Sequence, residues 1–358
     1  MSTIRAKAFQ HPSATSNNIT FNADGTHTVN AQHPITNKNL LINGGMNVWQ
    51  RNTSKTGITS GAYHTADRWH TALTTAGTWT QSRSTDVPSA QGFGYSLKMD
   101  CTTADASLGA SDVLTVLQRF EGQNLQHLLK GTSSAKKLTL SFWVKSNKTG
   151  TYIAELVDND NTRQISKSYT INSADTWEKK EITYDGDTSG VLDNDNEQSM
   201  RVIFWLAAGS NFTSGTLNTS WASTTNANRV VGQVNLADST SNEWYITGCQ
   251  LEVGSTASGF EFEPNGVTKR KCFRYFERGY GEYYWSPRSR SVFTSSNFCI
   301  IFLKESMRTN PTVSNVTTTN VTGHTVVRFS AKHFMGEGGA SSSSGTARYT
   351  GWQASAEL

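Results

Sequence analysis

Alternation of apolar and polar residues with a period of two recurs along most of the chain and restricts its possible folds more than any other feature. The clearest run is residues 137–145, in which every second side chain is apolar and would share one face of a strand: Leu138, Leu140, Phe142 and Val144. Similar runs follow, separated by turn-forming Asp, Asn and Gly residues, at 151–157, 163–171, 177–184, 201–206 and 244–253. Many short strands at this spacing predict an all-β jelly-roll sandwich over residues 41–264.

The remainder of the chain predicts a connecting helix and a second, smaller β-sandwich domain. The stretch from Gly266 to Arg278 contains no turn-forming residue in its interior, which favours a helix over residues 265–280. Residues 281–358 then contain several strand-like runs, at 291–294, 298–303, 325–329 and 347–354. Gly and Ser dominate residues 336–345, a composition typical of a flexible loop.

Residues 1–40 are polar and contain no cluster of apolar residues large enough to form a core. Asp24-Gly25 lies between two short alternating runs, a pattern that predicts a β-hairpin. An isolated hairpin is marginally stable in water, so this segment needs another surface to order it. We expect a virion-anchoring peptide that docks through its apolar side chains, and the alternative is a frayed terminus. These anchor candidates are Ile4, Phe9, Ile19, Phe21 and Val29.

Charge, hydropathy and cysteine content argue against several classes of protein. The net charge of +4 over 358 residues is too weak for a nucleic-acid binder. The basic stretch at 269–271 is interpreted as the solvated face of the connecting helix. No run of about 18 apolar residues is present, so no membrane insertion is expected. The four Cys residues are widely spaced, which predicts reduced, mostly buried thiols.

The sequence offers no recognisable catalytic centre. Its eight His residues are scattered, and the common hydrolase, nucleotide-binding and metalloprotease motifs are missing. His64, Asp67 and His70 lie close together, yet no third group is evident that would orient an acid–base pair. The oxygen-rich stretches at 158–161 and 193–197 lack the EF-hand layout and are interpreted as polar turns. We therefore expect no enzyme activity, no cofactor and no metal site.

Aromatic residues on the polar faces of two strands are better candidates for a binding site. Trp143 lies on the polar face of its strand beside Lys145, and Trp205 lies opposite the apolar face of its own strand, as does Arg201. An exposed Trp can stack on a sugar ring while a neighbouring cation binds the sugar hydroxyls. These four residues are the predicted glycan site. The alternative is that loops or a partner subunit cover both faces.

Several motifs resemble a family of bacteriophage structural proteins. They are Asn-Leu-Leu-Ile-Asn-Gly-Gly-Met-Asn-Val-Trp-Gln-Arg at 39–51, Ala-Asp-Arg-Trp at 66–69, Leu-Ser-Phe-Trp-Val-Lys-Ser at 140–146, Ile-Thr-Gly-Cys-Gln-Leu-Glu-Val-Gly at 246–254, Lys-Cys-Phe-Arg-Tyr-Phe at 271–276 and Met-Arg-Thr-Asn-Pro-Thr-Val at 307–313. Residues 11–18 are also similar to an N-terminal segment of marine and cyanobacterial phage appendage proteins. The resemblance covers nearly the whole chain.

This resemblance implies a fibre-like virion protein whose central domain is similar to jelly-roll carbohydrate-binding modules. Such modules often carry an Asp in the last strand that helps to bind calcium, and Thr247-Gly248-Cys249 occupy that stretch here, which argues against calcium. Fibre proteins of this kind are commonly homotrimers. The expected partners are a phage adaptor or capsid protein and a host surface glycan. The favoured function is host recognition by a tail fibre, ahead of a structural capsid decoration or head fibre protein and of a depolymerase.

Overall fold

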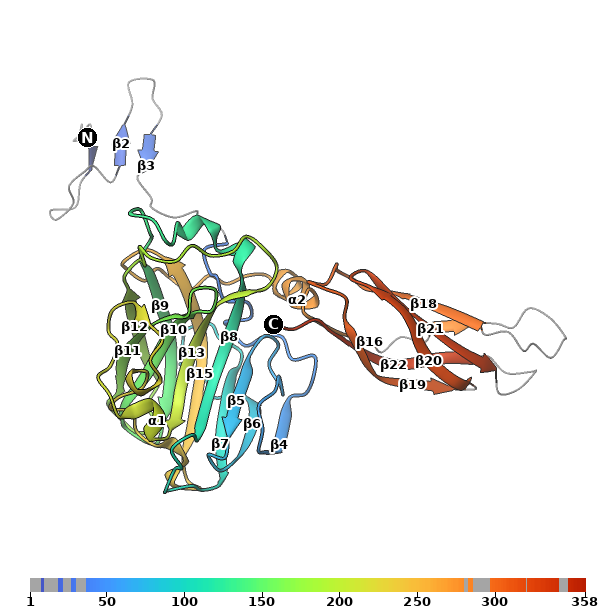
Figure 1. Ribbon diagram of the computed structural model, residues 1–358, viewed down its shortest axis with the longest axis horizontal. Helices are drawn as coiled ribbons and strands as arrows, with labels where there is room; N and C mark the ends of the chain where they lie inside the picture. The colour runs from blue at the N-terminus through green and yellow to red at the C-terminus, as the bar shows by residue number, and fades with distance from the viewer. Residues whose placement is uncertain are drawn as a thin grey trace, which may run out of the picture.

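The structure is a computed structural model that describes residues 8–9, 19–21, 27–29, 37–279, 283–285, 297–319, 321–340 and 347–358. It consists of a rounded β-sandwich and a narrower β domain that projects from one side of it (Figure 1). In the described part of the chain, no helix is long and apolar enough to span a bilayer.

The larger domain is a sandwich of two antiparallel sheets with six strands each, which confirms the predicted jelly roll. The first sheet, here called the β13 sheet, has the order β14-β11-β10-β13-β8-β5. Its strands are β5 (His70–Thr74), β8 (Val113–Glu121), β10 (Gly150–Asp158), β11 (Arg163–Ile171), β13 (Gln198–Ala208) and β14 (Ala222–Ser223).

The second sheet, here called the β9 sheet, has the order β12-β9-β15-β7-β6-β4. Its strands are β4 (Ser54–Ile58), β6 (Thr78–Ser84), β7 (Ser96–Thr103), β9 (Leu138–Ser146), β12 (Glu178–Tyr184) and β15 (Glu243–Val253). A short helix, α1 (Ser210–Thr213), and four 3-10 turns lie in the connections. These turns are Gly122–Asn124, Gln126–Leu128, Asn226–Asn228 and Leu236–Asp238.

Aromatic side chains hold the two sheets together. Phe142 of β9 contacts Phe204 of β13 edge to face, with ring centres 5.0 Å apart. Trp69 and Trp244 pack against the same Phe204 ring at 6.2 and 6.1 Å. Burying a large apolar side chain contributes about 1.5–3 kcal/mol, so this cluster is a main source of the stability of the sandwich. The alternation of β9 therefore places Phe142 in the core and Trp143 on the outside.

The Asn-Gly-Gly-Met-Asn-Val-Trp motif forms a tight turn built on Asn43. The Asn43 Oδ1 accepts the amides of Asn47 (2.8 Å) and Val48 (3.0 Å), and the residue adopts a left-handed backbone. Its neighbour Gly44 lies against β15, where an added Cβ would stand 2.0 Å from the Cys249 carbonyl oxygen. The motif is therefore structural, because it fastens the start of the domain to the last strand of the β9 sheet.

The smaller domain contains two sheets that follow α2 (Asn265–Phe273). The first has the order β16-β22-β17 with β19 also paired to β22, and the second has the order β18-β21-β20. Their strands are β16 (Phe276–Gly279), β17 (Tyr283–Trp285), β18 (Asn297–Phe302), β19 (Thr312–Thr319), β20 (Val321–Ser330), β21 (His333–Ala340) and β22 (Ala347–Ser355). The predicted strand at 291–294 lies outside the described residues.

Two predictions for this region need correction. The helix predicted over 265–280 ends at Phe273, because Phe276–Gly279 pair with β22 instead. The loop predicted over 336–345 is wrong for 336–340, since the glycines there form the end of β21 and pair through their backbone with β18 and β20. A backbone ladder needs no side chains, so Gly-rich composition does not exclude a strand that a neighbour completes.

The N-terminal segment contributes three short strands, β1 (Ala8–Phe9), β2 (Ile19–Phe21) and β3 (His27–Val29). Antiparallel pairing of Ile19 with Val29 and of Phe21 with His27 confirms the predicted hairpin. The anchor candidates Phe9, Ile19, Phe21 and Val29 lie on these strands, whereas Ile4 lies outside the described residues.

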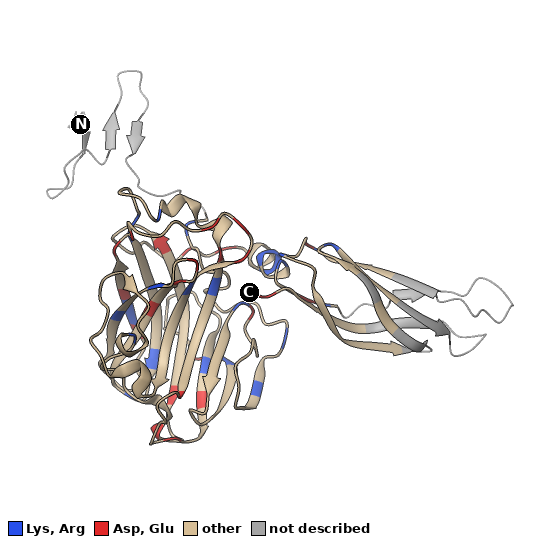
Figure 2. Cartoon of the chain, viewed as in Figure 1, with Lys and Arg blue, Asp and Glu red and all other residues tan. Residues whose placement is uncertain are grey.

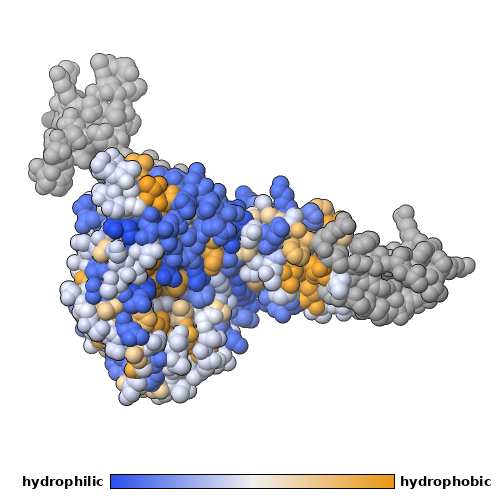
Figure 3. Space-filling model, in the orientation of Figure 1, coloured by the Kyte–Doolittle hydropathy of each residue, from blue (hydrophilic) through white to orange (hydrophobic). Residues whose placement is uncertain are grey.

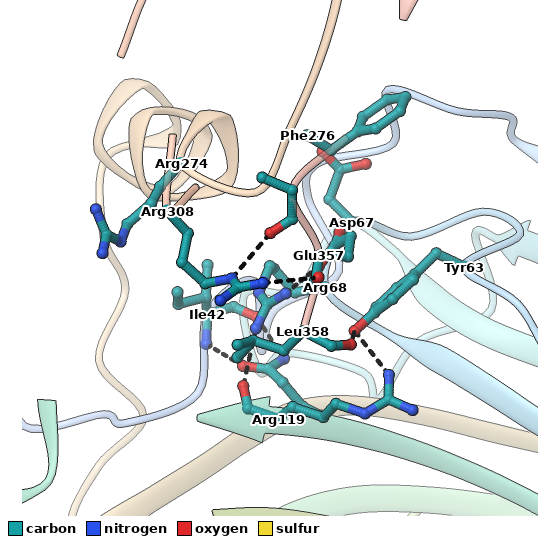
Figure 4. A network of polar contacts seen from close by, with 12 residues as sticks. Ile42, Tyr63, Asp67, Arg68, Arg119, Arg274, Phe276, Arg308, Glu357 and Leu358 are labelled. Carbon is teal, nitrogen blue, oxygen red and sulfur yellow. Dashed lines mark hydrogen bonds and ion pairs between the residues drawn. The ribbon is translucent and has the colours of Figure 1, made fainter. Parts of the chain in front are cut away.

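The end of the chain packs between the two domains (Figure 4). The Glu357 carboxylate forms ion pairs with the buried Arg68 and, at 3.0 Å, with Arg51 of the sandwich. The Arg68 guanidinium stacks 3.4 Å above the Tyr275 ring, and the Tyr63 hydroxyl donates to the Leu358 carbonyl oxygen at 3.3 Å. These contacts join the last residues of the chain to the sandwich.

A second set of contacts at this junction involves two arginines. Arg274 donates two hydrogen bonds to the buried carboxylate of Glu121 at 2.7 and 2.5 Å. Arg308 donates to the carbonyl oxygens of Asn196 in the sandwich (2.9 Å) and of Ala356 (3.1 Å). Paired arginine–carboxylate hydrogen bonds fix orientation as well as distance, so the two domains are held in a defined arrangement.

Candidate functional site

The four residues of the predicted glycan site lie on opposite sides of the sandwich. Trp143 and Lys145 are on β9, and Trp205 and Arg201 are on β13, which belongs to the other sheet. All four point away from the core, as the alternation predicts. The structure therefore supports two separate pairs and does not bring the four together into one site.

The prediction of an exposed Trp205 is wrong. Trp205 is only 2% exposed, because the connection between β13 and β15 crosses this face and packs Val230 and Phe212 against the ring. The indole Nε1 donates to Glu155 at 2.8 Å, and Arg229 binds the same carboxylate at 2.9 and 2.8 Å. Trp205 is thus part of a second, smaller core and has no free ring face to offer a ligand.

Arg201 lies beside Arg119 on the outward side of the β13 sheet, where both are partly buried. The two are directly paired across β13 and β8. Burial and the positive charge of Arg229 lower the pKa of Arg201 to about 10. Among the described residues, the Arg201 Nε has no hydrogen-bond partner. This side of the sandwich therefore keeps a cationic group, but the Trp205 ring predicted to act with it is buried. The view in Figure 3 is mainly hydrophilic, with small hydrophobic patches.

The outward side of the β9 sheet carries both an aromatic and a cationic component. Tyr245 of β15 is paired with Lys145 of β9 on one side and with Lys98 of β7 on the other. Trp177, immediately before β12, contacts Tyr245 with ring centres 6.2 Å apart, and the Lys145 ammonium lies 4.5 Å from the centre of the Tyr245 ring. Trp143 occupies the next row, between Lys179 and Thr247. We call these residues the β9 face: Trp143, Lys145, Trp177 and Tyr245.

A carboxylate in the connection between β6 and β7 fixes two side chains of the β9 face. The Asp86 carboxylate, in the connection between β6 and β7, forms an ion pair with Lys145 and accepts a hydrogen bond from the Trp177 indole at 2.8 Å. Partial burial opposes ionisation of Asp86, but these two hydrogen bonds outweigh it and keep the pKa of the carboxyl below its usual range. The negative charge of Asp86 therefore fixes both Lys145 and the Trp177 ring.

A second carboxylate performs a similar role at the other end of the row. Glu243 accepts hydrogen bonds from Lys98 and from the Tyr245 hydroxyl, both at 2.5 Å. Partial burial would raise the pKa of Glu243, yet the hydrogen bonds from Lys98 and Tyr245 lower it overall. Burial, together with the bond to Glu243, raises the pKa of Tyr245 to about 12. At neutral pH, the carboxylates that border the face are thus ionised, and the buried Tyr245 phenol is neutral.

Beyond Trp143, the outward side chains of the β9 sheet are polar, but Thr139, Gln250 and Glu252 are buried beneath residues 254–259. The Thr139 and Thr183 hydroxyls lie 3.1 Å apart, and the Gln250 amide donates to Glu252 at 2.9 Å. The rings of Trp143 and Trp177 are half-buried, so each keeps accessible surface. Aromatic platforms next to a polar group, here the Lys145 ammonium 5.9 Å from the Trp177 ring, are components that saccharide recognition uses.

Sequence reasoning identified Trp143 and Lys145 but missed Trp177, Tyr245 and Asp86. The alternation of residues 177–184 contained a signal for Trp177, because its position shares the outward parity of Lys179. Tyr245 likewise lies on the outward side of β15. No local pattern could have indicated Asp86, since its role depends on where the β6–β7 connection lies in the folded sandwich.

The other candidates for chemistry have structural partners. Asp158 pairs with Lys130 and accepts the Asn161 amide at 3.0 Å, which confirms a polar turn there. Asp67 accepts hydrogen bonds from Gln50, whereas the His64 ring contacts the Ser60 carbonyl oxygen at 3.2 Å, so these two residues have separate partners. Over the described residues, no group of three or more His, Cys, Asp or Glu is placed to hold a metal ion. Cys101, Cys249 and Cys272 are free and buried, as predicted.

No family model matches the chain, and no curated protein matches its sequence. Solved structures with a similar fold include the enzymatically active domain of tailspike protein 4 of bacteriophage CBA120, which is 14% identical with a TM-score of 0.33. That match covers 61% of this chain but only 22% of the tailspike chain.

Two carbohydrate-binding modules are also similar in structure. TmCBM61, solved with β-1,4-galactotriose, is 12% identical over 60% of this chain and 99% of its own, with a TM-score of 0.31. The family 11 module from Clostridium thermocellum, solved with a mixed-linked tetrasaccharide, is 11% identical over 58% of this chain and 99% of its own, with a TM-score of 0.30. These values assign no ligand to this chain.

Proposed function

We propose that this chain is a non-catalytic bacteriophage fibre protein that binds a host surface glycan through the β9 face. The observation that carries the proposal is the pair of half-buried rings, Trp143 and Trp177, beside the fixed cation of Lys145 on an otherwise polar sheet. The motifs that resemble phage structural proteins support the virion context, with attachment through the N-terminal segment.

Preorganisation favours binding at this face. Sugar rings stack on indole rings through their C–H faces, while cations and amides bind the hydroxyl groups. Asp86 already fixes Lys145 and Trp177 before any ligand arrives, which reduces the ordering that binding must impose. A sheet that is rigid through its hydrogen-bond ladders is a suitable support for such a platform.

The ionisation of the carboxylates at the β9 face favours binding of a glycan over its hydrolysis. Glycosidases generally need one carboxylic acid with a raised pKa that protonates the leaving group. Asp86 and Glu243, the carboxylates in contact with the β9 face, both have lowered pKa values and are engaged with lysines. Neither is suited to donate a proton at neutral pH.

Binding of the purified protein to host cells tests the proposal. Trp143→Ala and Trp177→Ala should each weaken binding about tenfold, which corresponds to about 1.4 kcal/mol for the loss of an aromatic anchor. The matched control is Trp221→Ala, because Trp221 is also half-buried but packs near Lys130, away from the β9 face. Unchanged binding by both β9-face variants, with melting temperatures equal to that of the wild type, would refute the proposed site.

The virion context has its own test. We propose a homotrimer anchored through residues 1–40, with Phe9, Ile19, Phe21 and Val29 as apolar contacts for a phage adaptor or capsid protein. A reconstruction of the virion would locate the chain at the tail if it is a host-recognition fibre. Density at a capsid vertex would favour the alternative, a decoration or head fibre protein with a structural role. A monomeric mass for the purified protein would contradict the trimer.

A further inference from the structure

Two arginines lie side by side on the outward side of the β13 sheet. Arg201 of β13 and Arg119 of β8 are directly opposite each other in the antiparallel ladder, and we call them the arginine pair. Like charges in this position destabilise a sheet, because the Cβ atoms of directly opposite residues are only about 4.5–5.5 Å apart. Such a pair therefore needs a nearby negative charge to offset the repulsion.

Arg201 has no such partner. Among the described residues, its guanidinium forms no hydrogen bond or ion pair, and its Nε is buried without an acceptor. Its neighbour on β10 is Val157, which belongs to the small core around Trp205. A guanidinium N–H that leaves water without a new acceptor raises the free energy of the folded state. The position of Arg201 is therefore suited to an anion that supplies the missing acceptors.

Arg119 has a neutral partner that leaves its charge uncompensated. Its Nη1 donates to the Tyr63 hydroxyl at 2.9 Å, and that hydroxyl donates onward to the Leu358 carbonyl oxygen (Figure 4). Burial raises the pKa of Tyr63, so the phenol carries no negative charge at neutral pH. Arg119 thus keeps a full positive charge and the donors that Tyr63 does not use.

The carboxylates of this region are engaged with other arginines. Glu155 accepts hydrogen bonds from Arg229 at 2.9 and 2.8 Å, Glu121 accepts two from Arg274, and Glu357 is held by the two arginines described above. On the side of the sandwich that Figure 2 shows, basic and acidic residues are interspersed, so an excess of one charge is not a general property of this surface. The arginine pair is a local exception.

His70 of β5 provides a further unpartnered nitrogen beside the arginine pair. Its Nδ1 is buried and has no hydrogen-bond partner in the described part of the chain. Its ring contacts Tyr63 edge to face at 4.9 Å, and Tyr63 also contacts Arg119. Burial lowers the pKa of His70 to about 3, and the charge of Arg119 acts in the same direction. The imidazole is therefore neutral and can donate one N–H to an anion.

We propose that the arginine pair binds a phosphate group between its two guanidinium groups. Charge complementarity favours phosphate, because the pair contributes two positive charges and a phosphate group carries about 1.5–2 negative charges at neutral pH. A carboxylate carries one negative charge. The site is on the opposite sheet from the β9 face and does not depend on it. Arg201, predicted to bind a glycan beside Trp205, thus has a role that does not need the buried indole.

Isothermal titration calorimetry of the full-length protein, at one ionic strength, tests the chemistry with small probes. Inorganic phosphate should bind at least tenfold more tightly than acetate. Glucose 6-phosphate then distinguishes two sources of the group: tighter binding than inorganic phosphate identifies a phosphorylated sugar, and equal binding identifies the free anion. Equal affinity for acetate, or no detectable binding of either phosphate, would overturn the inference.

Substitutions of Arg201 locate the site. Arg201→Gln should reduce the affinity for phosphate at least tenfold, and Arg201→Lys, which keeps the charge but loses the planar fork, should reduce it less. Arg83→Gln is the matched control, because Arg83 is an exposed arginine on β6 of the other sheet that contacts the Tyr95 ring. Wild-type affinity in Arg201→Gln would contradict the site.

Thermal unfolding of the same variants gives a second readout. Without phosphate, Arg201→Gln should melt at or above the wild-type temperature, because it removes an uncompensated charge from a partly buried position. With phosphate, the melting temperature should rise for the wild type but not for this variant. A lower melting temperature in Arg201→Gln, together with a normal response to phosphate, would show that Arg201 has only a structural role.

The Trp143→Ala variant of the β9 face separates this inference from the proposed glycan site. It should keep the wild-type affinity for phosphate even where it binds host cells less tightly. Loss of phosphate binding in Trp143→Ala, with no effect of Arg201→Gln, would move the anion to the β9 face and overturn the inference.

Discussion

At the scale of residues, the junction depends on charges that are almost fully removed from water. Asp67 is one of them. It accepts hydrogen bonds from Gln50 and lies 3.8 Å from the Arg51 guanidinium. Burial raises the pKa of Asp67 to about 6, although Arg51 and Gln50 act in the opposite direction. Arg51 and Gln50 therefore offset only part of the free-energy cost of removing the ionised Asp67 carboxylate from water.

This raised pKa predicts a specific pH dependence. The folded protein holds the Asp67 proton up to about pH 6, whereas the unfolded chain releases it near the ordinary value of 3.8. The folded state thus binds more protons in this window, so the Asp67 contribution to stability decreases as pH rises from about 4 to 6, by about 3 kcal/mol. Denaturant unfolding of the wild type and of Asp67→Asn at several pH values checks this. Parallel curves for the two proteins would contradict it.

At the scale of elements, the last strand of the sandwich shows how one glycine shapes a sheet. The pairing of β15 with β9 is shifted between Thr247 and Gln250, and Gly248 in this bulge has a φ of +62°. A Cβ there would stand 2.6 Å from the Phe93 ring, which packs against Phe260 and Phe262. The bulge lets the Phe93 cluster cover the sheet next to the β9 face.

Gly248→Ala should therefore lower the free energy of unfolding by about 2 kcal/mol or more, because it combines an unfavourable backbone conformation with a clash. Gly94→Ala is the control. Gly94 belongs to the same connection as Phe93 but has no atom within 4 Å of an added Cβ and no left-handed backbone, so its change should stay within about 0.5 kcal/mol. Urea unfolding measures both. An equal effect of the two substitutions would contradict the role given to Gly248.

The strands and helices also show which features of the fold local sequence patterns could predict. The parity of β9 and β13 follows from local alternation, so the outward direction of Trp143 and Trp205 was predicted correctly. Whether an outward side chain stays accessible depends on segments distant in sequence. Residues after β13 bury Trp205, and Asp86 from the β6–β7 connection organises the β9 face. The ends of α2 and β21 were mispredicted for the same reason, since pairing with β22 and β18 decides them.

At the scale of the whole molecule, the two domains are joined by buried, directional contacts. Arg274 and Arg308 both link the region after α2 to the sandwich, through Glu121 and Asn196. Removing one partner of a buried ion pair generally costs about 3–5 kcal/mol. The smaller domain should therefore depend on the sandwich for part of its stability.

Calorimetry tests this coupling. The wild type should unfold in one transition, whereas Arg274→Ala combined with Arg308→Ala should release the smaller domain as a separate transition at lower temperature. Lys179→Ala, which removes an exposed pair with Glu181, should leave the profile unchanged. A single transition at the wild-type temperature in the double variant would show that the junction contributes little to cooperativity.

The return of the chain to the sandwich has a mechanical consequence. The polypeptide leaves the sandwich through α2, and after β22 its last residues come back to Arg51, Arg68 and Tyr63. A pull on the far tip of the smaller domain is then shared between the peptide linker and the ion pairs of Glu357. A force applied at the tip would therefore be transmitted to the sandwich with little rotation of the smaller domain about the junction.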